Sequence, residues 1–310
     1  ARARDERRRA DVAMGKASKD KRDIYYRKAK EEGWRARSAF KLLQIDESFD
    51  IFRDVTHVVD LCAAPGSWSQ VLSRKLYLPA LARGVPADEL PKIVAIDLQP
   101  MAPIEGVTTI QGDITSMDKV REVLSHFDGK YADLIVGDGA PDVTGLHDLD
   151  EFMQAQLILA GLTVATHILK PGGTFIAKIF RGKDVSLLYS QLKIFFPNVT
   201  CAKPKSSRNS SIEAFIVCQG YTPPPGFDPS QLTRILEERA MSHAGDNNTE
   251  TVGTKTWPKD VLVPFLACGD LSGYDADQSY ALDDDGVRLQ PVQPPTTPAY
   301  KTAIELLKKK

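Results

Sequence analysis

The sequence has little cysteine, and its four cysteines, Cys62, Cys201, Cys218 and Cys268, lie far apart in 310 residues. None has the close spacing of a metal-binding motif, and three stand inside apolar runs. We therefore expect no disulfide framework and no metal site. The pattern indicates reduced cysteines in the core of an intracellular protein, cytoplasmic with a nuclear pool left open.

Long apolar runs are also missing, since none approaches the roughly 18 residues that a membrane-spanning helix requires. The Arg-rich beginning contains Asp5, Glu6 and Asp11, unlike a transit peptide. A dehydrogenase is disfavoured because the Gly-x-Gly-x-x-Gly turn is absent. We take residues 1–13 as a disordered leader or upstream extension and Met14 as the native start.

Charge is unevenly distributed along a chain whose net charge is −1. Residues 1–41 hold fifteen Lys or Arg and seven Asp or Glu, and residues 16–37 mix bases with aromatic rings. Such a mixture is what an RNA-contacting surface needs, although a charge run can also be a solvated helix face. The candidate RNA contacts are Lys19, Lys21, Arg22, Arg27, Lys28, Arg35, Arg37 and, from the basic loop 203–211, Arg208.

Apolar runs that end in acids predict an α/β sheet. Residues 58–73 form a strand, a small-residue turn and a helix, and further strands are predicted at 93–97, 107–114, 132–141, 174–180 and 213–218. Helices are expected at 38–45, with Ser38 as N-cap, and at 149–169, while 78–92 looks like a loop insertion.

Three of these strands place Asp60, Asp97 and Asp113 at their ends, and Asp138 follows the fourth. Each acid alone can be a turn residue. Because open α/β sheets bind ligands at the carboxyl ends of their strands, together the acids indicate a nucleoside site. Lys178 lies in the middle of an apolar strand, where a charged amine needs an acidic partner or a catalytic task.

Three motifs stand out at residues 60–70 (Asp-Leu-Cys-Ala-Ala-Pro-Gly-Ser-Trp-Ser-Gln), 138–145 (Asp-Gly-Ala-Pro-Asp-Val-Thr-Gly) and 177–180 (Ala-Lys-Ile-Phe). They resemble the FtsJ-like family of S-adenosylmethionine-dependent RNA 2′-O-ribose methyltransferases. The resemblance covers about residues 16–220. It implies a Rossmann-like fold, with a mostly parallel seven-stranded sheet and helices on both faces, and S-adenosylmethionine as cofactor.

Residues 18–27, 34–43 and 145–148 are similar to the eukaryotic branch of that family that modifies the tRNA anticodon loop at positions 32 and 34. The resemblance implies two accessory proteins, a helical-repeat partner for position 32 and a WD-repeat partner for position 34. Residues 14–221 would form the methyltransferase domain. The tail, 222–310, would be partly disordered, or would wrap or dock through a segment at 257–275.

The same resemblance implies the site residues. The family's catalytic tetrad corresponds to Lys41, Asp138, Lys178 and Glu213, and the methyl-donor contacts to Gly66, Trp68, Asp97, Asp113 and Asp138. Lys178 would act as general base if neutral, or would orient the ribose hydroxyl if charged. Asp60 would be structural or would support the residues that contact the donor.

Other activities remain as alternatives. An RNA cytosine-C5 methyltransferase has a similar donor loop, but it needs a nucleophilic Cys near the end of the fourth or fifth strand, where this sequence has none. A ribosomal RNA 2′-O-methyltransferase of the same family and a catalytically silent RNA-binding subunit are the remaining two.

Overall fold

The computed structural model describes residues 23–141, 147–182, 185–230, 265–270 and 272–280. The predicted leader 1–13 and the candidate RNA contacts Lys19, Lys21 and Arg22 lie outside these ranges. No helix in the described part of the chain is both long and apolar enough to cross a membrane.

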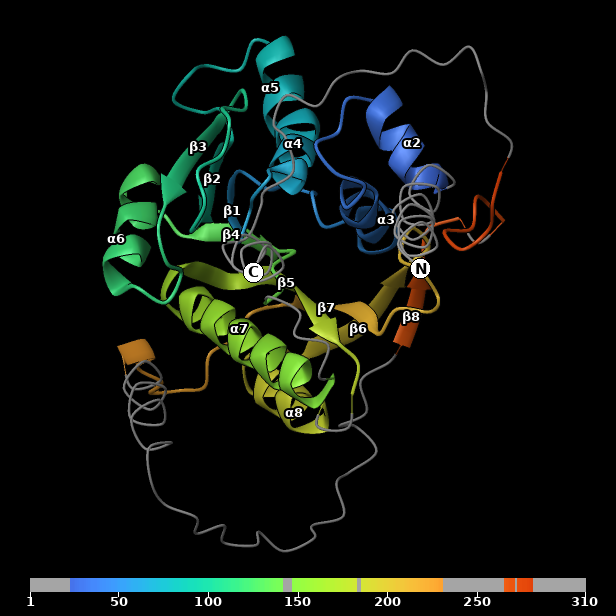
Figure 1. Ribbon diagram of the computed structural model, residues 1–310. Helices are drawn as coiled ribbons and strands as arrows, with labels where there is room; N and C mark the ends of the chain where they lie inside the picture. The colour runs from blue at the N-terminus through green and yellow to red at the C-terminus, as the bar shows by residue number, and fades with distance from the viewer. Residues whose placement is uncertain (1–22, 142–146, 183–184, 231–264, 271, 281–310) are drawn as a thin grey trace, which may run out of the picture.

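An open sheet organises the molecule, with strands in the order β3-β2-β1-β4-β5-β7-β6-β8 (Figure 1). Strands β1 to β5 pair in parallel, β7 runs antiparallel between β5 and β6, and β8 pairs in parallel with β6. The first seven strands form the expected mostly parallel sheet. The strands are β1 (His57–Leu61), β2 (Lys92–Asp97), β3 (Val107–Gln111), β4 (Ala132–Gly137), β5 (Leu169–Phe180), β6 (Asn198–Pro204), β7 (Glu213–Gln219) and β8 (Phe265–Cys268).

Helices cover both faces of the sheet, as predicted (Figure 1). One face carries α2 (Ile24–Glu31), α3 (Ala39–Phe49), α4 (Ser67–Leu72), the π-helical turn η1 (Ser73–Tyr77) and α5 (Leu78–Ala82). The other carries α6 (Met117–His126), α7 (His147–Ile168) and α8 (Val185–Phe195).

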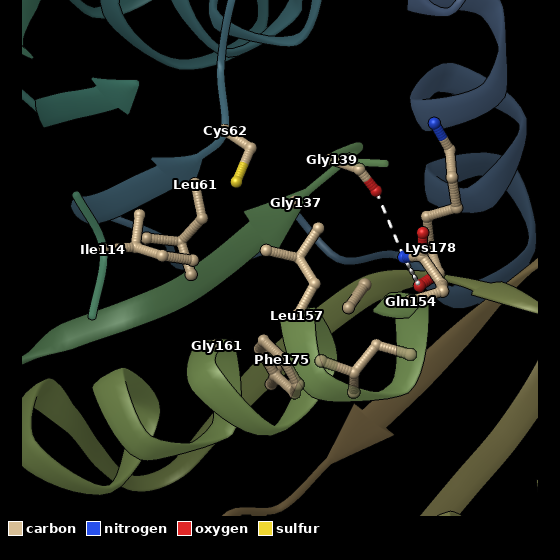
Figure 2. Close-up of a pocket in the computed structure, with 12 residues that line it drawn as sticks. Leu61, Cys62, Ile114, Gly137, Gly139, Gln154, Leu157, Gly161, Phe175 and Lys178 are labelled. Atoms are coloured by element: carbon tan, nitrogen blue, oxygen red, sulfur yellow. Dashed lines mark hydrogen bonds between the residues drawn. The ribbon is translucent and has the colours of Figure 1, made fainter. Parts of the chain in front are cut away.

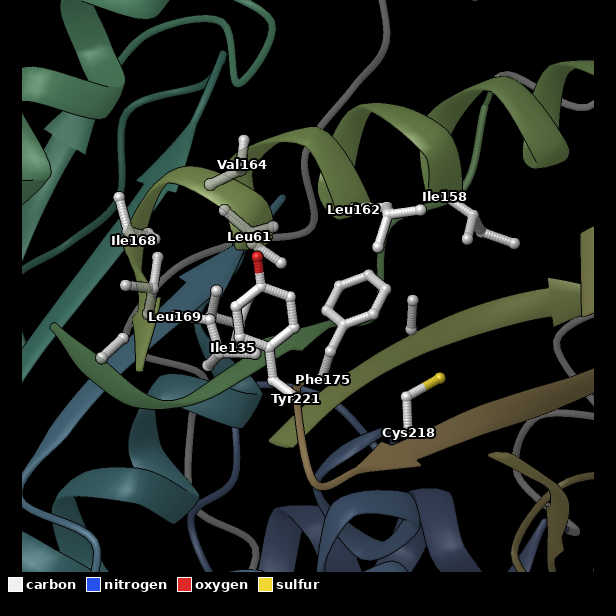
Figure 3. Close-up of a cluster of buried hydrophobic side chains, with 14 of the residues drawn as sticks. Leu61, Ile135, Ile158, Leu162, Val164, Ile168, Leu169, Phe175, Cys218 and Tyr221 are labelled. Carbon is white, nitrogen blue, oxygen red and sulfur yellow. The ribbon is translucent and has the colours of Figure 1, made fainter. Parts of the chain in front are cut away.

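Strand alternation decides which side chains face which layer, because successive residues of a strand point to opposite faces. On β5, Phe175, Ala177 and Ile179 pack in the core beneath α7, which Figure 3 shows around Phe175, Leu162 and Ile158. Ile176 belongs instead to the core beneath α3 and α4. Lys178 has the same parity as Ile176, so its side chain is directed to the α3 face.

One local prediction is wrong, and another is confirmed in position only. Residues 78–92 are not one loop, because the helix that begins at Ser67 continues through η1 into α5. Ser38 stands at the N-cap position of α3 but makes no capping hydrogen bond, since its Oγ lies 2.6 Å from Ser67 Oγ instead.

Part of the predicted tail belongs to the same compact unit. Strand β8 extends the sheet, and Ala276 is buried with Ile24 and Tyr25 of α2. Tyr25 Oη donates a 2.8 Å hydrogen bond to the Tyr274 carbonyl. The described portion of the predicted docking segment, 265–270 and 272–275, therefore packs on its own domain, whereas 257–264 lies outside the described residues.

Candidate active site

The four predicted tetrad residues converge on the α3 face of the sheet. Lys178 Nζ lies 2.7 Å from Asp138 Oδ1, 3.8 Å from Glu213 Oε2 and 2.6 Å from the Asp138 carbonyl, to which it donates. Lys41, from α3, donates to Glu213 Oε2 at 2.9 Å and lies 2.7 Å from Oε1. Two cations and two carboxylates thus form one cluster from α3, β5, β7 and the end of β4.

Strand geometry explains this convergence. Leu134 and Val136 on β4 face α3, so Asp138, two residues on, has the same parity. On β7, Phe215 and Val217 face α3, and Glu213 precedes them by two. The register Lys178↔Phe215 places Glu213 diagonally across from Lys178.

Electrostatics favour the ionised forms of Lys178 and Glu213. Burial, the largest single effect, lowers the pKa of Lys178, but Asp138 and Glu213 together outweigh it, so that the pKa lies above its ordinary value. For Glu213, burial raises the pKa, yet Lys41 and Lys178 bring it down to about 2. A lysine held in this way is an ammonium group with fixed hydrogen-bond directions.

Glu213 also has supports that the sequence did not reveal. Ser207 Oγ donates to Glu213 Oε1 at 2.7 Å, and Lys203 Nζ donates to the carbonyls of Ser211, at 2.9 Å, and Glu213. Lys203 is buried, which lowers its pKa to about 8 despite the attraction of Glu213. The sequence feature that could have identified Lys203 is its position directly after the apolar residues of β6, at the start of the basic loop.

The predicted donor loop follows β1. Gly66 has a φ of +100°, a conformation that favours glycine, and a Cβ there would lie 2.7 Å from Arg35 Nη1. Arg35 itself donates to the carbonyls of Pro65 and Pro103, both at 2.9 Å, and its backbone N–H donates to Gln70 Oε1. The guanidinium of Arg35, predicted to contact RNA, therefore holds the loop in place.

Asp97 and Asp113 follow neighbouring strands at the same edge. Asp97 accepts hydrogen bonds from the N–H groups of Ala64 (2.8 Å) and Gln99 (2.7 Å), which fix its carboxylate beside the donor loop. Asp113 Oδ1 accepts from the backbone and hydroxyl of Thr115, both at 2.8 Å. Both carboxylates keep further lone pairs for a ligand.

The side chain of Trp68 is buried between secondary-structure elements and is not exposed to a ligand. Its indole is 1% exposed, packs on Phe215 with ring centroids 5.5 Å apart, and donates through Nε1 to the Ser38 carbonyl at 2.8 Å. The side chain thus ties α4 to α3 and β7. The methyl-donor contact that the resemblance implies for Trp68 would therefore use its backbone.

Asp60 is fully buried beneath the donor loop, in agreement with the structural role expected for it. Its Oδ2 accepts a 2.6 Å hydrogen bond from Ser69 Oγ. Burial raises the pKa of this carboxyl to about 7, and the nearby charges of Asp138 and Asp97 add to the rise.

Two of the described candidate RNA contacts pair with Asp23, the N-cap of α2. Asp23 Oδ2 pairs with Arg37 and, at 3.0 Å, with Arg208. Lys28 Nζ stands 4.5 Å from the centre of the Tyr274 ring, and Arg27 donates to the Tyr280 carbonyl at 3.4 Å. Residues from both ends of the chain therefore share this face.

A small pocket opens on the α7 side of the same strands (Figure 2). Leu61, Cys62 and Gly139 line it from the strand ends, and Gln154 and Leu157 line it from α7. Burial raises the pKa of the Cys62 thiol to about 12, which disfavours its reactive thiolate form at neutral pH.

The sheet order and the acids at its carboxyl edge define the class: this is a Rossmann-like methyltransferase fold. The family model described as FtsJ-like methyltransferase matches residues 34–221. The chain belongs to the FtsJ-like methyltransferase family.

Relatives match nearly the whole chain. The Mus musculus protein named tRNA (cytidine(32)/guanosine(34)-2′-O)-methyltransferase is 60% identical over 299 residues, covering 95% of this chain and 87% of that protein. The Schizosaccharomyces pombe protein of the same name is 57% identical over 295 residues, covering 94% and 98%. Among solved structures, a ribosomal RNA methyltransferase from Plasmodium falciparum superposes with a TM-score of 0.51 and 29% identity, covering 61% of this chain and 98% of that one.

Proposed function

We propose that this protein is an S-adenosylmethionine-dependent methyltransferase that methylates the ribose 2′-oxygen of tRNA nucleotides 32 and 34. The observation that carries the proposal is the convergence of Lys41, Asp138, Lys178 and Glu213 at the carboxyl edge of the sheet. The names of the mouse and fission yeast relatives, which include both positions, support the choice of substrate.

The residues at this edge fit the methyl donor. Asp97 and Asp113 offer carboxylate oxygens to ribose hydroxyls and to an adenine amino group, and Leu98, 67% exposed, adds apolar surface beside them. Asp138, at the end of β4, supplies a carboxylate for a cationic ligand. When bound, the donor supplies an electrophilic sulfonium methyl group.

Lys178 would orient the acceptor. As an ammonium group held by Asp138 and Glu213, it would donate a hydrogen bond to the ribose 2′-oxygen and leave a lone pair directed at the methyl group. Once the 2′-oxygen has accepted the methyl group, it is an oxonium ion, whose remaining proton is strongly acidic. This proton can pass to water without a strong base. The raised pKa of Lys178 favours this positioning role over that of a general base.

The other tetrad residues hold Lys178 and the ribose in place. Lys41 and Ser207 fix Glu213, and Glu213 keeps Lys178 charged. Asp138, at the junction of donor loop and acceptor side, would contact both ligands. Arg27, Lys28, Arg37 and Arg208 would bind the RNA backbone outside the target nucleotide.

Accessory proteins complete the proposal. A helical-repeat partner would direct the enzyme to position 32 and a WD-repeat partner to position 34, in the cytoplasm. Co-purification of this chain with each partner, followed by methylation assays at each position, tests the assignment. Equal methylation of both positions by the chain alone would contradict it.

The decisive experiment is nucleoside mass spectrometry of tRNA from cells that lack the gene. We expect 2′-O-methylation at positions 32 and 34 to be lost and then restored by the wild type but not by Lys178→Ala. Lys130→Ala, at an exposed position, is the matched control and should restore both marks. Restoration by Lys178→Ala, or methylation of ribosomal RNA in place of tRNA by the purified protein, would overturn the proposal.

A further inference from the structure

The pairing of β4 with β5 stops just before the catalytic residues. The last register pair of this ladder is Gly137↔Ala177. Asp138 and Lys178 come one residue later on their strands. Their relative position therefore depends on contacts other than the β4–β5 ladder.

Gln154 of α7 supplies such a contact. Its Nε2 donates to the Lys178 carbonyl at 2.9 Å and to the Gly139 carbonyl at 3.2 Å. Figure 2 shows both hydrogen bonds, with one amide nitrogen between the two carbonyl oxygens. A single side chain thus joins the residue after Asp138 to the backbone of Lys178.

This link acts from the face opposite to the chemistry. In Figure 2 the Lys178 side chain extends away from α7, toward the α3 face, while Gln154 reaches its carbonyl from the α7 side. On the α3 face, Lys178 Nζ joins the same two segments again through the Asp138 carbonyl at 2.6 Å. The end of β4 is held to β5 from both sides.

The environment of Gln154 makes an amide unexpected on packing grounds. The residue is 2% exposed, and its neighbours in the pocket include Leu157, Ile158 and Phe175. Its Oε1 is buried and makes no hydrogen bond within the described part of the chain. An apolar side chain would fill this space without leaving a buried acceptor unpaired, so a packing role alone does not account for the glutamine.

We propose that Gln154 is a positioning residue for the methyl transfer: it sets the distance between Asp138 and Lys178 by holding the carbonyls of Gly139 and Lys178 together. This inference rests on the proposed function, because it concerns the same reaction. Misplacement of reacting groups by about 1 Å can reduce a rate about 100-fold.

The test compares Gln154→Met with Gln156→Met in the full-length protein, with its partner where turnover requires one. Methionine keeps the length of the side chain but cannot donate, and Gln156 is exposed on the same helix. For Gln154→Met we expect kcat for tRNA methylation to fall about 10- to 100-fold, with KM for both substrates and the binding constant for S-adenosylhomocysteine within about threefold of wild type. Gln156→Met should match the wild type.

A second variant guards against a folding defect. Gln154→Asn keeps an amide but is one methylene too short for both carbonyls, and we expect the same selective loss of kcat. Wild-type kcat in either variant would overturn the inference. So would a loss of kcat that vanishes when the assay temperature is lowered, since that outcome would indicate stability alone. Absence of tRNA methylation by the wild-type protein would instead contradict the proposed function.

Discussion

Lys41 Nζ lies 2.7 Å from one carboxylate oxygen of Glu213 and 2.9 Å from the other, although 172 residues separate them in the chain. Both side chains are nearly buried, at 11% and 15% exposed. Because removal of one partner leaves the other as an unpaired charge in the interior, we expect Lys41→Met to lower the free energy of unfolding by roughly 3 kcal/mol. Turnover should be abolished as well.

Denaturant unfolding measures this effect, and a surface pair provides the control. Lys92 and Asp128 also pair, but the Asp128 side chain is 75% exposed and screened by water, so Lys92→Met should cost much less stability than Lys41→Met. The double variant Lys41→Met/Glu213→Gln should recover part of the lost stability but no activity. Equal costs for Lys41→Met and Lys92→Met would contradict a buried pair.

The protonation state of Lys178 predicts the pH profile of turnover. Its pKa is raised above the ordinary lysine value, because Asp138 and Glu213 outweigh the effect of burial. If the ammonium form is the active one, the rate at saturating substrate stays level from about pH 7 to pH 9 and falls only as pH passes the raised pKa. A rate that rises tenfold per pH unit over this interval would show that Lys178 is a general base.

The raised pKa of Asp60 predicts how the free energy of unfolding changes with pH. Its folded pKa, about 7, lies above the ordinary value of 3.8, so the folded state binds an extra proton between these values and stability from this group falls as pH rises. Asp60→Asn removes this loss and can still accept from Ser69. We expect its unfolding free energy to exceed that of wild type by an amount that grows from pH 4 to pH 7, up to roughly 4 kcal/mol.

Chemical denaturation at several pH values tests the Asp60 prediction. Asp88→Asn, at an exposed position, is the control and should track the wild type throughout. A difference between Asp60→Asn and wild type that stays constant with pH would show that the carboxyl is already ionised at pH 4.

Substitution of Arg35 should affect binding of the methyl donor but not binding of tRNA. Because its guanidinium donates to the carbonyls of Pro65 and Pro103 and lies against Gly66, we expect Arg35→Gln to raise KM for S-adenosylmethionine about tenfold while tRNA affinity changes less than twofold. Steady-state kinetics and tRNA binding assays measure the two effects. Arg53→Gln, an exposed position, should change neither, and a selective loss of tRNA affinity in Arg35→Gln would restore Arg35 to the RNA-contacting set.

The contacts of residues 265–280 predict how truncation of the chain affects its stability. A chain that ends at residue 264 loses β8, the Tyr274 contact to Tyr25 and the hydrogen bond from Asn209 N–H to Asp277 Oδ2 (2.6 Å). We expect its melting temperature to fall by several degrees and its activity to be lost even with partner added. A chain that ends at residue 280 keeps these contacts and should retain its melting temperature; identical melting of both truncations would contradict the assignment.

Strand ends and buried charges were predictable because each leaves a local signal. An acid after an apolar run, as at Asp97 and Asp138, identifies the carboxyl edge of a parallel sheet, and a lysine inside a strand, as at Lys178, identifies a charge that needs partners. The parity of β4, β5 and β7 then brings these residues to one face. Here the local pattern and the tertiary structure agree.

The contacts that the sequence did not reveal are non-local. Arg35 looked like an RNA contact because it is a base among aromatics, and only folding places it against Pro103, 68 residues away. Trp68 lies in the predicted donor motif, yet its indole packs between α3 and β7. Strand β8 has four residues, and the apolar run 261–268 indicates a segment that docks but not its pairing with β6.

The position of β8 in the chain has a consequence for synthesis. Proteins fold from the N-terminus as they leave the ribosome, and β1 to β7 are complete by residue 219. Until residues 265–268 emerge, β6 presents an unpaired backbone edge, which is a template for aggregation. Helix α2, the first described element, gains its contacts with Tyr274 and Ala276 only after those later residues have been synthesised. A ribosome that stalls between these points would leave the β6 edge free to pair with another chain.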